Sequence, residues 1–341
     1  MSFLYDMGTK LRNVLYNHQW LSSKSYPLPV ICVGNLAVGG TGKTPHTEYL
    51  IRLLQAEGKR VATLSRGYKR HTKGYHKATP QSTVQDIGDE PWQLLHNHPD
   101  ITVAVDEDRC HGIEQLLQEQ PQIDVILLDD AYQHRAVKAG LNILLTDYHR
   151  LYTRDMLLPA GRLRESKAGA QRAQIVIVTK CPAQLSEAEA HDIKAELQLM
   201  PHQQLYFTTI TYGEPQPMFA AAPWPKDIDA TYTLLALTGI AHPAPMIDHL
   251  QSLTPHVEHI SFADHHDFTP KDLQHIQQTF AQLPEKKLII TTQKDAARLQ
   301  GLASQLAPAF QQHLYALPIQ VEFIHEQQAA FDQSVINYLK Q

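Results

Sequence analysis

The residues best suited to carry chemistry form a glycine-rich segment, Ala37-Val38-Gly39-Gly40-Thr41-Gly42-Lys43-Thr44. Its end matches the phosphate-binding pattern G-x-x-x-x-G-K-[ST], although Ala37 stands at the first glycine position and Gly39 and Gly40 supply the flexibility. In such a loop, backbone N–H groups at a helix N-terminus face phosphate oxygens. Lys43 would contact the β- and γ-phosphates, and Thr44 would hold Mg²⁺. The segment therefore predicts a P-loop that binds a nucleoside triphosphate with Mg²⁺.

An acidic pair supplies the second half of such a site. Asp129 and Asp130 follow the apolar run Val125-Ile126-Leu127-Leu128, which is typical of a buried strand. Carboxylates at this position hold Mg²⁺ directly or through water, and either aspartate could be the direct ligand. The alternative is an ordinary helix cap. Beside a P-loop, the pair predicts a magnesium site.

The elements that must position these residues alternate between strands and helices. A strand is predicted at residues 29–33 before the P-loop, and a helix at 45–56 after it, with Pro45 in the first turn. Further strands are predicted at 60–64, 100–105, 124–128, 141–146 and 174–179, with helices at 90–96 and 112–118 between them. This alternation predicts an α/β fold resembling P-loop NTPases, with a mostly parallel sheet and helices on both faces.

The pattern changes after about residue 200. Residues 213–230 hold four prolines and little periodicity, which predicts a linker. Beyond them, strands are predicted at 232–236 and 287–291 and helices at 244–253 and 270–283. The predicted domains are therefore a P-loop domain at 1–212 and a smaller C-terminal α/β domain at 231–341.

Composition narrows the possible partners. The 341-residue chain has a formal net charge of -5, so no global positive field indicates nucleic acid. Its three cysteines share no metal-type spacing, and this sparse, odd count is typical of reduced thiols in the cytosol. No run of about 18 apolar residues occurs, so no membrane-spanning helix is predicted.

The first 20 residues carry an apolar stripe at helical spacing, made by Phe3, Leu4, Met7, Leu11, Val14 and Leu15. Polar residues, among them Lys10 and Arg12, lie off the stripe. Two interpretations stay open. The helix either packs on its own domain or lies in a membrane interface.

Several further motifs complete a pattern that covers most of the chain. They are Val33-Gly34-Asn35-Leu36, Ser65-Arg66-Gly67-Tyr68, Gly88-Asp89-Glu90-Pro91, Asp129-Asp130-Ala131-Tyr132-Gln133-His134-Arg135, Leu158-Pro159-Ala160-Gly161-Arg162-Leu163-Arg164-Glu165, Asp264-His265-His266 and Thr292-Gln293-Lys294-Asp295-Ala296. In order and spacing they resemble the tetraacyldisaccharide 4'-kinase family. The family usually has Gly-Phe or Gly-Leu at Ala131-Tyr132 and Glu at Gln293.

The resemblance implies transfer of the ATP γ-phosphate to the 4'-hydroxyl of a tetraacylated glucosamine disaccharide 1-phosphate, giving the 1,4'-bisphosphate lipid IVA of lipid A biosynthesis. It also implies two domains joined by a hinge, with the site in the cleft. Asp89 matches the family's base, which takes the proton of the sugar hydroxyl. His265 would orient or assist Asp89, although His266 could act instead. Lys43 completes the expected catalytic set.

The resemblance also assigns residues to the substrate. Arg66, Tyr68, His134, Arg164 and His266 are expected near the sugar-phosphate end, where arginines suit a phosphate. Glu165 is expected to reach Mg²⁺. Lys294 and Asp295 form either a structural ion pair or a nucleotide contact, and the role of Gln293 stays open.

A lipid substrate favours membrane contact by the N-terminal helix. We therefore expect a cytoplasmic enzyme that is peripheral on the cytoplasmic face of the inner membrane. A monomer is expected as well, although the sequence leaves the oligomeric state open. The main alternative is a P-loop ATPase or GTPase switch, or a chaperone, without a small-molecule acceptor. Thr179-Lys180-Cys181-Pro182 lacks both the Asn and the Asp of the guanine-binding Asn-Lys-x-Asp motif. A kinase for a soluble sugar or nucleoside and a non-catalytic nucleotide-binding module are further alternatives.

Overall fold

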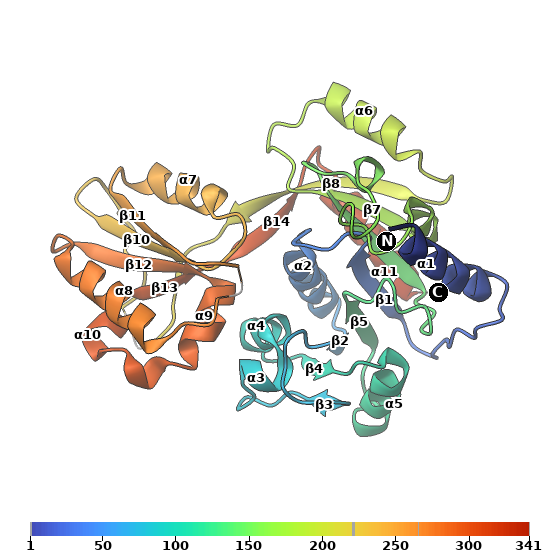
Figure 1. Ribbon diagram of the computed structural model, residues 1–341, viewed down its shortest axis with the longest axis horizontal. Helices are drawn as coiled ribbons and strands as arrows, with labels where there is room; N and C mark the ends of the chain where they lie inside the picture. Colours follow the sequence, from blue (N-terminus) through green and yellow to red (C-terminus); the bar gives the residue numbers. More distant parts are fainter. Residues whose placement is uncertain (1, 220–221, 265, 341) are drawn as a thin grey trace. The chain divides into compact units, whose positions relative to one another are not determined.

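The computed structural model describes residues 2–219, 222–264 and 266–340, with side chains from residue 7 onward. The chain forms two compact units (Figure 1). Unit 1 combines Met1–Thr211 with Val321–Gln341, and unit 2 is Tyr212–Gln320. Unit 2 is therefore inserted into the sequence of unit 1.

A nine-stranded sheet is the centre of unit 1. Its strands lie in the order β14 (Ile319–Phe323), β8 (Gln204–Tyr212), β7 (Ile175–Thr179), β6 (Leu141–Asp147), β1 (Val30–Asn35), β5 (Val125–Asp129), β2 (Val61–Ser65), β4 (Thr102–Val105) and β3 (His76–Lys77). From β8 to β4, adjacent strands run parallel to one another, whereas β3 runs antiparallel to β4. In the register of β1 and β5, Val33 pairs with Asp129. Parallel pairing places the end of β1, where the P-loop begins, beside the end of β5.

Helices cover both faces of this sheet, as the alternating pattern predicts. The larger ones are α2 (Lys43–Ala56), α4 (Asp89–Asn97), α5 (Arg109–Glu119), α6 (Glu187–Leu197) and α11 (Gln328–Leu339). Along β1, Val30 and Cys32 join one core with α5 and α6, whereas Ile31 and Val33 join the other with α2, α4 and α11. Every residue of β1 is buried, and its first four residues, Val30 to Val33, are apolar on both faces.

Unit 2 has its own sheet and its own cores. The strand order is β11 (Val257–Ser261), β10 (Thr233–Thr238), β12 (Lys287–Thr292), β13 (Leu314–Leu317) and β9 (Gln216–Pro217), and only the β13–β9 pair is antiparallel. The helices are α7 (Ala244–Leu253), α8 (Pro270–Gln282), α9 (Gln293–Gln300) and α10 (Pro308–Gln311). Thr269 and Asp272 form a capping box at the start of α8.

The boundaries differ from the predicted ones in two places. Residues 321–341 belong to unit 1 rather than to the C-terminal domain, because α11 buries Phe331 and Val335 in the core beneath β1. The hydroxyl of Tyr338 also donates to the carbonyl oxygen of Val30 at 3.1 Å and accepts from its N–H at 3.0 Å. Residues expected to form a linker instead pair as β9 with β13, so they are part of unit 2.

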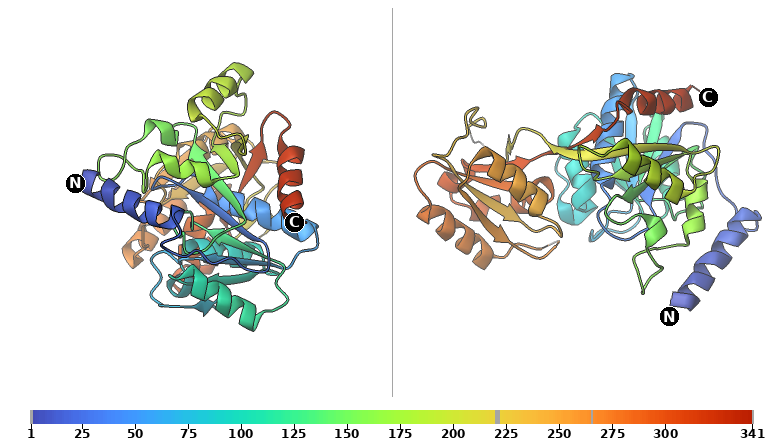
Figure 2. Two further views of the ribbon diagram at one scale, coloured as in Figure 1. Left: turned by 90° about the vertical axis from the view of Figure 1, so that its right-hand side faces the viewer. Right: turned by 90° about the horizontal axis from the view of Figure 1, so that it is seen from above.

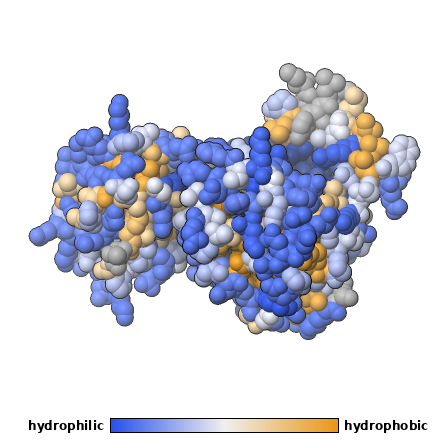
Figure 3. All heavy atoms as spheres, turned by 90° about the horizontal axis from the view of Figure 1, so that it is seen from below, coloured by the Kyte–Doolittle hydropathy of each residue, from blue (hydrophilic) through white to orange (hydrophobic). Residues whose placement is uncertain are grey.

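The N-terminal helix α1 (Ser2–Asn17) projects from unit 1 (Figure 2). Met7, Leu11 and Val14 are about half exposed, at 55%, 59% and 48% of their surface. In Figure 3, apolar side chains lie along this helix, in the upper right part of the picture. Phe3 and Leu4 of the predicted stripe lie outside the described side chains. Among the described residues, no helix is both long and apolar enough to cross a membrane.

Candidate active site

The glycine-rich segment connects the end of β1 to the start of α2, which begins at Lys43. Gly39 and Gly42 have φ angles of 112° and 82°, a region that favours glycine. Ala37 instead pairs with Leu163 in a short antiparallel bridge, a conformation that alanine adopts without strain. The alanine at the first glycine position is therefore compatible with the loop, because the required left-handed angles fall on other residues.

Side chains at the ends of two strands, β1 and β7, fix the shape of the loop. Asn35 Nδ2 donates to Thr41 Oγ1 at 2.8 Å, and Thr179 Oγ1 donates to the Thr41 carbonyl at 2.9 Å. Lys180 Nζ donates to the carbonyl of Gly40. These contacts hold the loop from the C-terminal ends of β1 and β7. Thr179 and Lys180 therefore hold the backbone of the P-loop in place. No sequence motif predicted this role.

A buried histidine holds the last turn of the loop. His46 Nδ1 lies 2.7 Å from the carbonyl oxygen of Gly42, and Nε2 lies 3.1 Å from Thr208 Oγ1. Burial lowers the pKa of His46 to about 4, so the imidazole is neutral at pH 7. A neutral ring that bridges Gly42 to β8 positions the loop without adding positive charge. No motif marks this residue, because its role depends on the distant Thr208.

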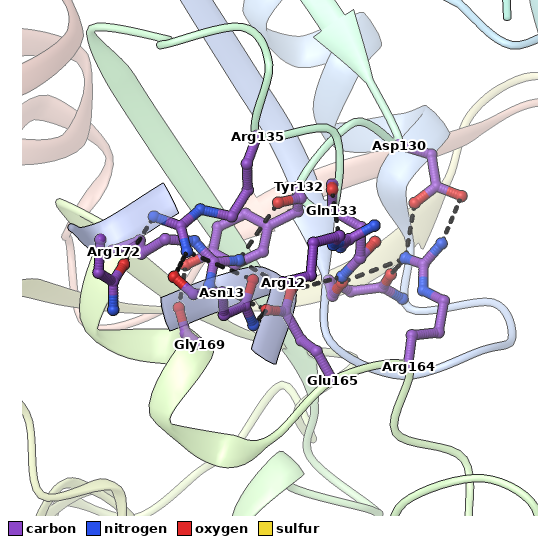
Figure 4. A network of polar contacts seen from close by, with 12 residues as sticks. Arg12, Asn13, Asp130, Tyr132, Gln133, Arg135, Arg164, Glu165, Gly169 and Arg172 are labelled. Carbon is purple, nitrogen blue, oxygen red and sulfur yellow. Dashed lines mark hydrogen bonds and ion pairs between the residues drawn. The ribbon is translucent and has the colours of Figure 1, made fainter. Parts of the chain in front are cut away.

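Asp130 lies beside the P-loop lysine. Its backbone is in the left-handed region with φ 49°, which aspartate tolerates. Its carboxylate lies 3.8 Å from Lys43 Nζ and accepts two hydrogen bonds from Arg164, at 2.7 and 3.2 Å (Figure 4). Burial acts to raise the pKa of Asp130, but the charges of Lys43 and Arg164 outweigh it and lower the pKa. Asp130 is therefore ionised and held in place.

Asp129 is fully buried at the end of β5. Its Oδ1 accepts a hydrogen bond from Thr47 Oγ1 at 3.3 Å. Burial raises the pKa of Asp129, and the negative charge of Glu90 raises it further, although Lys43 opposes this. A carboxylate that is desolvated and repelled by a second carboxylate is stabilised by a divalent cation. Hard oxygen donors of this kind, together with the buried hydroxyl-bearing Thr44 in the first turn of α2, fit Mg²⁺.

Glu165 is completely buried, and its carboxylate is held by other protein groups (Figure 4). Arg172 donates to it at 2.8 and 2.9 Å, Gln133 Nε2 at 3.0 Å and Asn13 Nδ2 at 3.1 Å. These partners satisfy both oxygens of Glu165 and connect helix α1 to the residues around Asp130. The magnesium role predicted for Glu165 is untested, and the contacts favour a structural role.

Two loops place the predicted base and two predicted substrate residues in unit 1. Arg66 and Tyr68 are exposed just after β2, and Asp89 is the first residue of α4. Gly67 and Gly88 lie where these loops touch. A Cβ atom at Gly88 would come within 2.9 Å of the Tyr68 carbonyl oxygen, so both motifs require glycine.

His134 lies in the turn that follows Asp130, half buried, with Nε2 3.7 Å from Asp108 Oδ1. Burial lowers the pKa of His134, and the nearby positive charge of Arg109 lowers it further. Arg109 was not predicted. It is almost fully buried at the start of α5, and its charge helps to lower the pKa of Asp130. No sequence motif indicates this arginine, because it lies at the start of α5 and the acidic pair lies at the end of β5.

The remaining predicted residues lie in unit 2. His266 Nε2 is 2.9 Å from Asp272 Oδ2, and its ring stacks on Phe262. His265 lies outside the described residues. The predicted pairing of a histidine with Asp89 therefore stays a prediction. Asp295 follows Lys294, with which an ion pair was one of the two predicted roles. It is buried and pairs with Arg298, at 3.0 Å.

Asp295 also accepts hydrogen bonds at 2.8 Å from the Gly239 N–H and from Thr292 Oγ1. These bonds join the end of β10 to the start of α9. Asp295 thus has a structural role within unit 2. Neither contact tests whether Lys294 or Gln293 touches nucleotide.

A P-loop at the end of a central parallel strand, with a lysine and an acidic pair from the next strand, defines a P-loop nucleotide-binding enzyme. The lysine and the carboxylate pair are arranged to bind a triphosphate with its metal ion. The positive charges of Arg164 and Arg109 keep Asp130 ionised at that position.

Comparison with known proteins identifies the family within this class. The family model for tetraacyldisaccharide-1-P 4'-kinase matches residues 1–340. A tetraacyldisaccharide 4'-kinase from Bacteroides thetaiotaomicron is 51% identical over 357 residues, covering 100% of this chain and 92% of that protein. One from Phocaeicola vulgatus is 50% identical over 348 residues, covering 100% and 94%. This chain belongs to the tetraacyldisaccharide-1-P 4'-kinase family.

A solved structure agrees with this assignment. The crystal structure of an apo form of LpxK from Aquifex aeolicus in complex with ATP matches with a TM-score of 0.76 and 29% identity. The match covers 99% of this chain and 97% of that one. The predicted α/β fold of P-loop type is thereby confirmed, and the chain is a phosphotransferase.

Proposed function

We propose that this protein transfers the γ-phosphate of ATP to the 4'-hydroxyl of tetraacyldisaccharide 1-phosphate in lipid A biosynthesis. The observation that carries the proposal is the P-loop with Lys43 next to an ionised Asp130, in a chain of this family. Phosphoryl transfer depends mainly on positioning and on charge neutralisation. The described contacts supply both, since hydrogen bonds from β1 and β7 hold the loop and Arg164 holds Asp130.

The nucleotide half of the reaction is assigned to unit 1. The loop amides and Lys43 bind the β- and γ-phosphates, and Gly42 exposes the N-terminus of α2 to them. Thr44 and Asp129 would hold Mg²⁺, and Arg164 keeps Asp130 in position. When bound, Mg²⁺ neutralises charge on the β- and γ-phosphate oxygens.

The acceptor half needs a group that takes the proton of the sugar hydroxyl as the new bond forms. Asp89 is our candidate, because it begins α4 in the loop pair that also carries Arg66 and Tyr68. His265 would keep the Asp89 carboxylate ionised and oriented, with His266 as the second choice. His266 already has an acidic partner in Asp272, which favours His265.

The 1-phosphate of the substrate needs cationic donors that are not already engaged. Arg164 uses its terminal nitrogens on Asp130 and on Asn35, so its contribution is to position Asp130. Arg66 is exposed and suits a phosphate through two parallel hydrogen bonds. Tyr68 and His134 would contact the sugar ring.

The N-terminal helix is suited to contact the lipid surface in which the acyl chains lie. Its exposed face carries Met7, Leu11 and Val14, whereas its other face is docked by polar contacts. Arg135 donates to the Asn13 carbonyl at 3.0 Å and to Asn17 Oδ1 at 2.7 Å. A helix with its polar face on the protein and its apolar face outward fits an interfacial anchor. We therefore propose that the protein is peripheral on the cytoplasmic face of the inner membrane. We also propose that it acts as a monomer.

One assay tests the reaction. The protein is incubated with γ-labelled ATP, Mg²⁺ and tetraacyldisaccharide 1-phosphate in detergent, and the lipid fraction is analysed for a bisphosphorylated product. We expect label in that product and ATP turnover that depends on the acceptor lipid. ATP or GTP hydrolysis of equal rate without lipid, and no labelled lipid, would instead support the switch or chaperone alternative.

A further inference from the structure

Three residues capable of binding a metal lie together at the start of α5, outside the set assigned to Mg²⁺. Asp108 caps α5, Cys110 is in its first turn, and His134 comes from the turn after β5. One possible ligand atom from each, a carboxylate oxygen, Sγ and a ring nitrogen, lie within 4.8 Å of one another. The three residues are not a sequence motif, because the fold brings His134 to Cys110 from a different element.

His134 carries a polar atom that the described protein does not satisfy. Its Nε2 is buried and has no hydrogen-bond partner in the described structure. The nearest acid oxygen, Asp108 Oδ1, is 3.7 Å away, beyond hydrogen-bond distance. Imidazole nitrogen is the commonest protein ligand for transition metals. An unsatisfied buried nitrogen needs a partner, and a cation among these donors supplies one.

The other two donors are compatible with that partner. Asp108 accepts the N–H groups of Cys110 and His111 on Oδ1, at 2.9 and 3.4 Å, which leaves Oδ2 for a metal. Cys110 is a free cysteine and is partly exposed. Burial raises the pKa of the Cys110 thiol, but a bound zinc ion displaces the thiol proton to solvent as the metal–sulfur bond forms.

The donor set selects the type of metal. One sulfur, one imidazole nitrogen and one carboxylate oxygen are the ligands of tetrahedral Zn²⁺, with water in the fourth position. Mg²⁺ requires oxygen ligands in octahedral geometry and is a poor match. We infer that Asp108, Cys110 and His134 form a Zn²⁺ site separate in its ligands from the magnesium site.

Zinc at this position has a consequence for the reaction, and this part rests on the proposed function. His134 is assigned to the sugar-phosphate substrate, so a Zn²⁺ ion that ligates Nε2 removes it from that role. Zn²⁺ therefore inhibits lipid phosphorylation by the holoenzyme at a site other than the ATP-bound metal. Cys110 takes no part in the proposed transfer, so removing its sulfur relieves inhibition without reducing the zinc-free rate.

The binding test uses Co²⁺ as a spectroscopic substitute for Zn²⁺ on the full chain. We expect one Co²⁺ per chain, a thiolate-to-cobalt absorption band, and displacement of that band by Zn²⁺. Cys110→Ser should abolish the band and weaken Zn²⁺ binding at least about tenfold, because a thiolate ligand is lost. His111→Ala is the matched control, since this neighbouring histidine pairs with Asp106 and lies outside the three-ligand set. It should keep both the band and the affinity.

Absence of the band in the wild-type protein, or an unchanged Zn²⁺ affinity in Cys110→Ser, would overturn the site. Cys110→Ala, with its folding checked by circular dichroism, guards against a folding defect in the serine variant. Binding that leaves the wild-type rate unaffected would overturn the inhibitory step. A protein that binds Co²⁺ through Cys110 but phosphorylates no lipid would overturn the proposed function and keep the zinc site.

Discussion

Arg164 clamps the carboxylate of Asp130 with two hydrogen bonds, at 2.7 and 3.2 Å, while Lys43 Nζ lies 3.8 Å from the same group. Lysine cannot reproduce a planar two-nitrogen contact. Arg164→Lys should therefore lower kcat by about tenfold or more, because Asp130 loses its fixed orientation. Steady-state kinetics with ATP and acceptor lipid measure the effect.

The matched control is Arg154→Lys. Arg154 makes a similar two-nitrogen contact with Glu196 on the surface, away from the P-loop. We expect kcat to stay within about twofold there, since exposed ion pairs contribute little. Equal losses in both variants would show that Arg164 acts through general stability rather than through Asp130.

Substitutions of Asp89 and of Lys43 should have different effects on phosphate transfer and on nucleotide binding. If Asp89 is the base, Asp89→Asn should lower lipid phosphorylation by about 100-fold or more and leave ATP affinity nearly unchanged. Lys43→Ala should reduce both. Fluorescent-nucleotide titration and the labelled-lipid assay give the two readouts. A normal rate in Asp89→Asn would remove Asp89 as the base, and the exposed Asp100→Asn provides the control for a surface carboxylate.

His46 predicts a pH dependence of stability. Its pKa is about 4 in the folded protein and 6.5 when unfolded, so the unfolded chain binds more protons between these values. The free energy of unfolding therefore falls as the pH drops through this window, by about 2 kcal/mol at pH 5. His46→Asn should lose less stability between pH 7 and pH 5 than the wild type, as measured by urea unfolding.

The control for His46 is His96. Its Nδ1 lies 2.9 Å from the Trp92 carbonyl four residues earlier, the same local contact that His46 makes with Gly42, but the side chain is exposed. His96→Asn should leave the pH dependence unchanged. The same slope in His46→Asn and wild type would mean that other groups cause the acid sensitivity.

The exposed face of α1 should determine binding to lipid bilayers. Leu11→Ser combined with Val14→Ser removes apolar area from that face and should weaken partitioning onto anionic vesicles at least about tenfold. Flotation of the protein with vesicles measures this, and the KM for lipid substrate should rise while ATP binding is unchanged. Met200→Ser changes an exposed apolar residue elsewhere and should behave as wild type. Unchanged flotation of the double variant would contradict the anchor.

The nucleotide half of the site was predictable because its chemistry depends on residues that are adjacent in the sequence. Gly42, Lys43 and Thr44 follow an apolar strand, and Asp129 and Asp130 follow another, so strand and motif together locate them. Parallel pairing of β1 with β5 then brings the two motifs together, as the pattern of a buried parallel sheet implies.

The supporting residues were not predictable, since each acts across a long interval of sequence. His46 depends on Thr208, and Glu165 depends on Asn13 and Arg172. Pairwise contacts of this kind leave no periodicity in a single sequence. The return of α11 to the first unit was missed for a related reason, because its apolar residues equally fit a helix of the second sheet.

The bond between Tyr338 and Val30 joins residues 308 positions apart, so the P-loop unit is closed by a helix that is synthesised only after the whole inserted unit. Until α11 leaves the ribosome, β1 lacks the apolar cover of Phe331 and Val335. The nascent chain thus exposes part of its nucleotide-binding core while unit 2 is being made, a period in which chaperones can bind it. Loss of α11 would therefore destabilise β1, the strand that precedes the P-loop, although every residue of the loop itself would be unchanged.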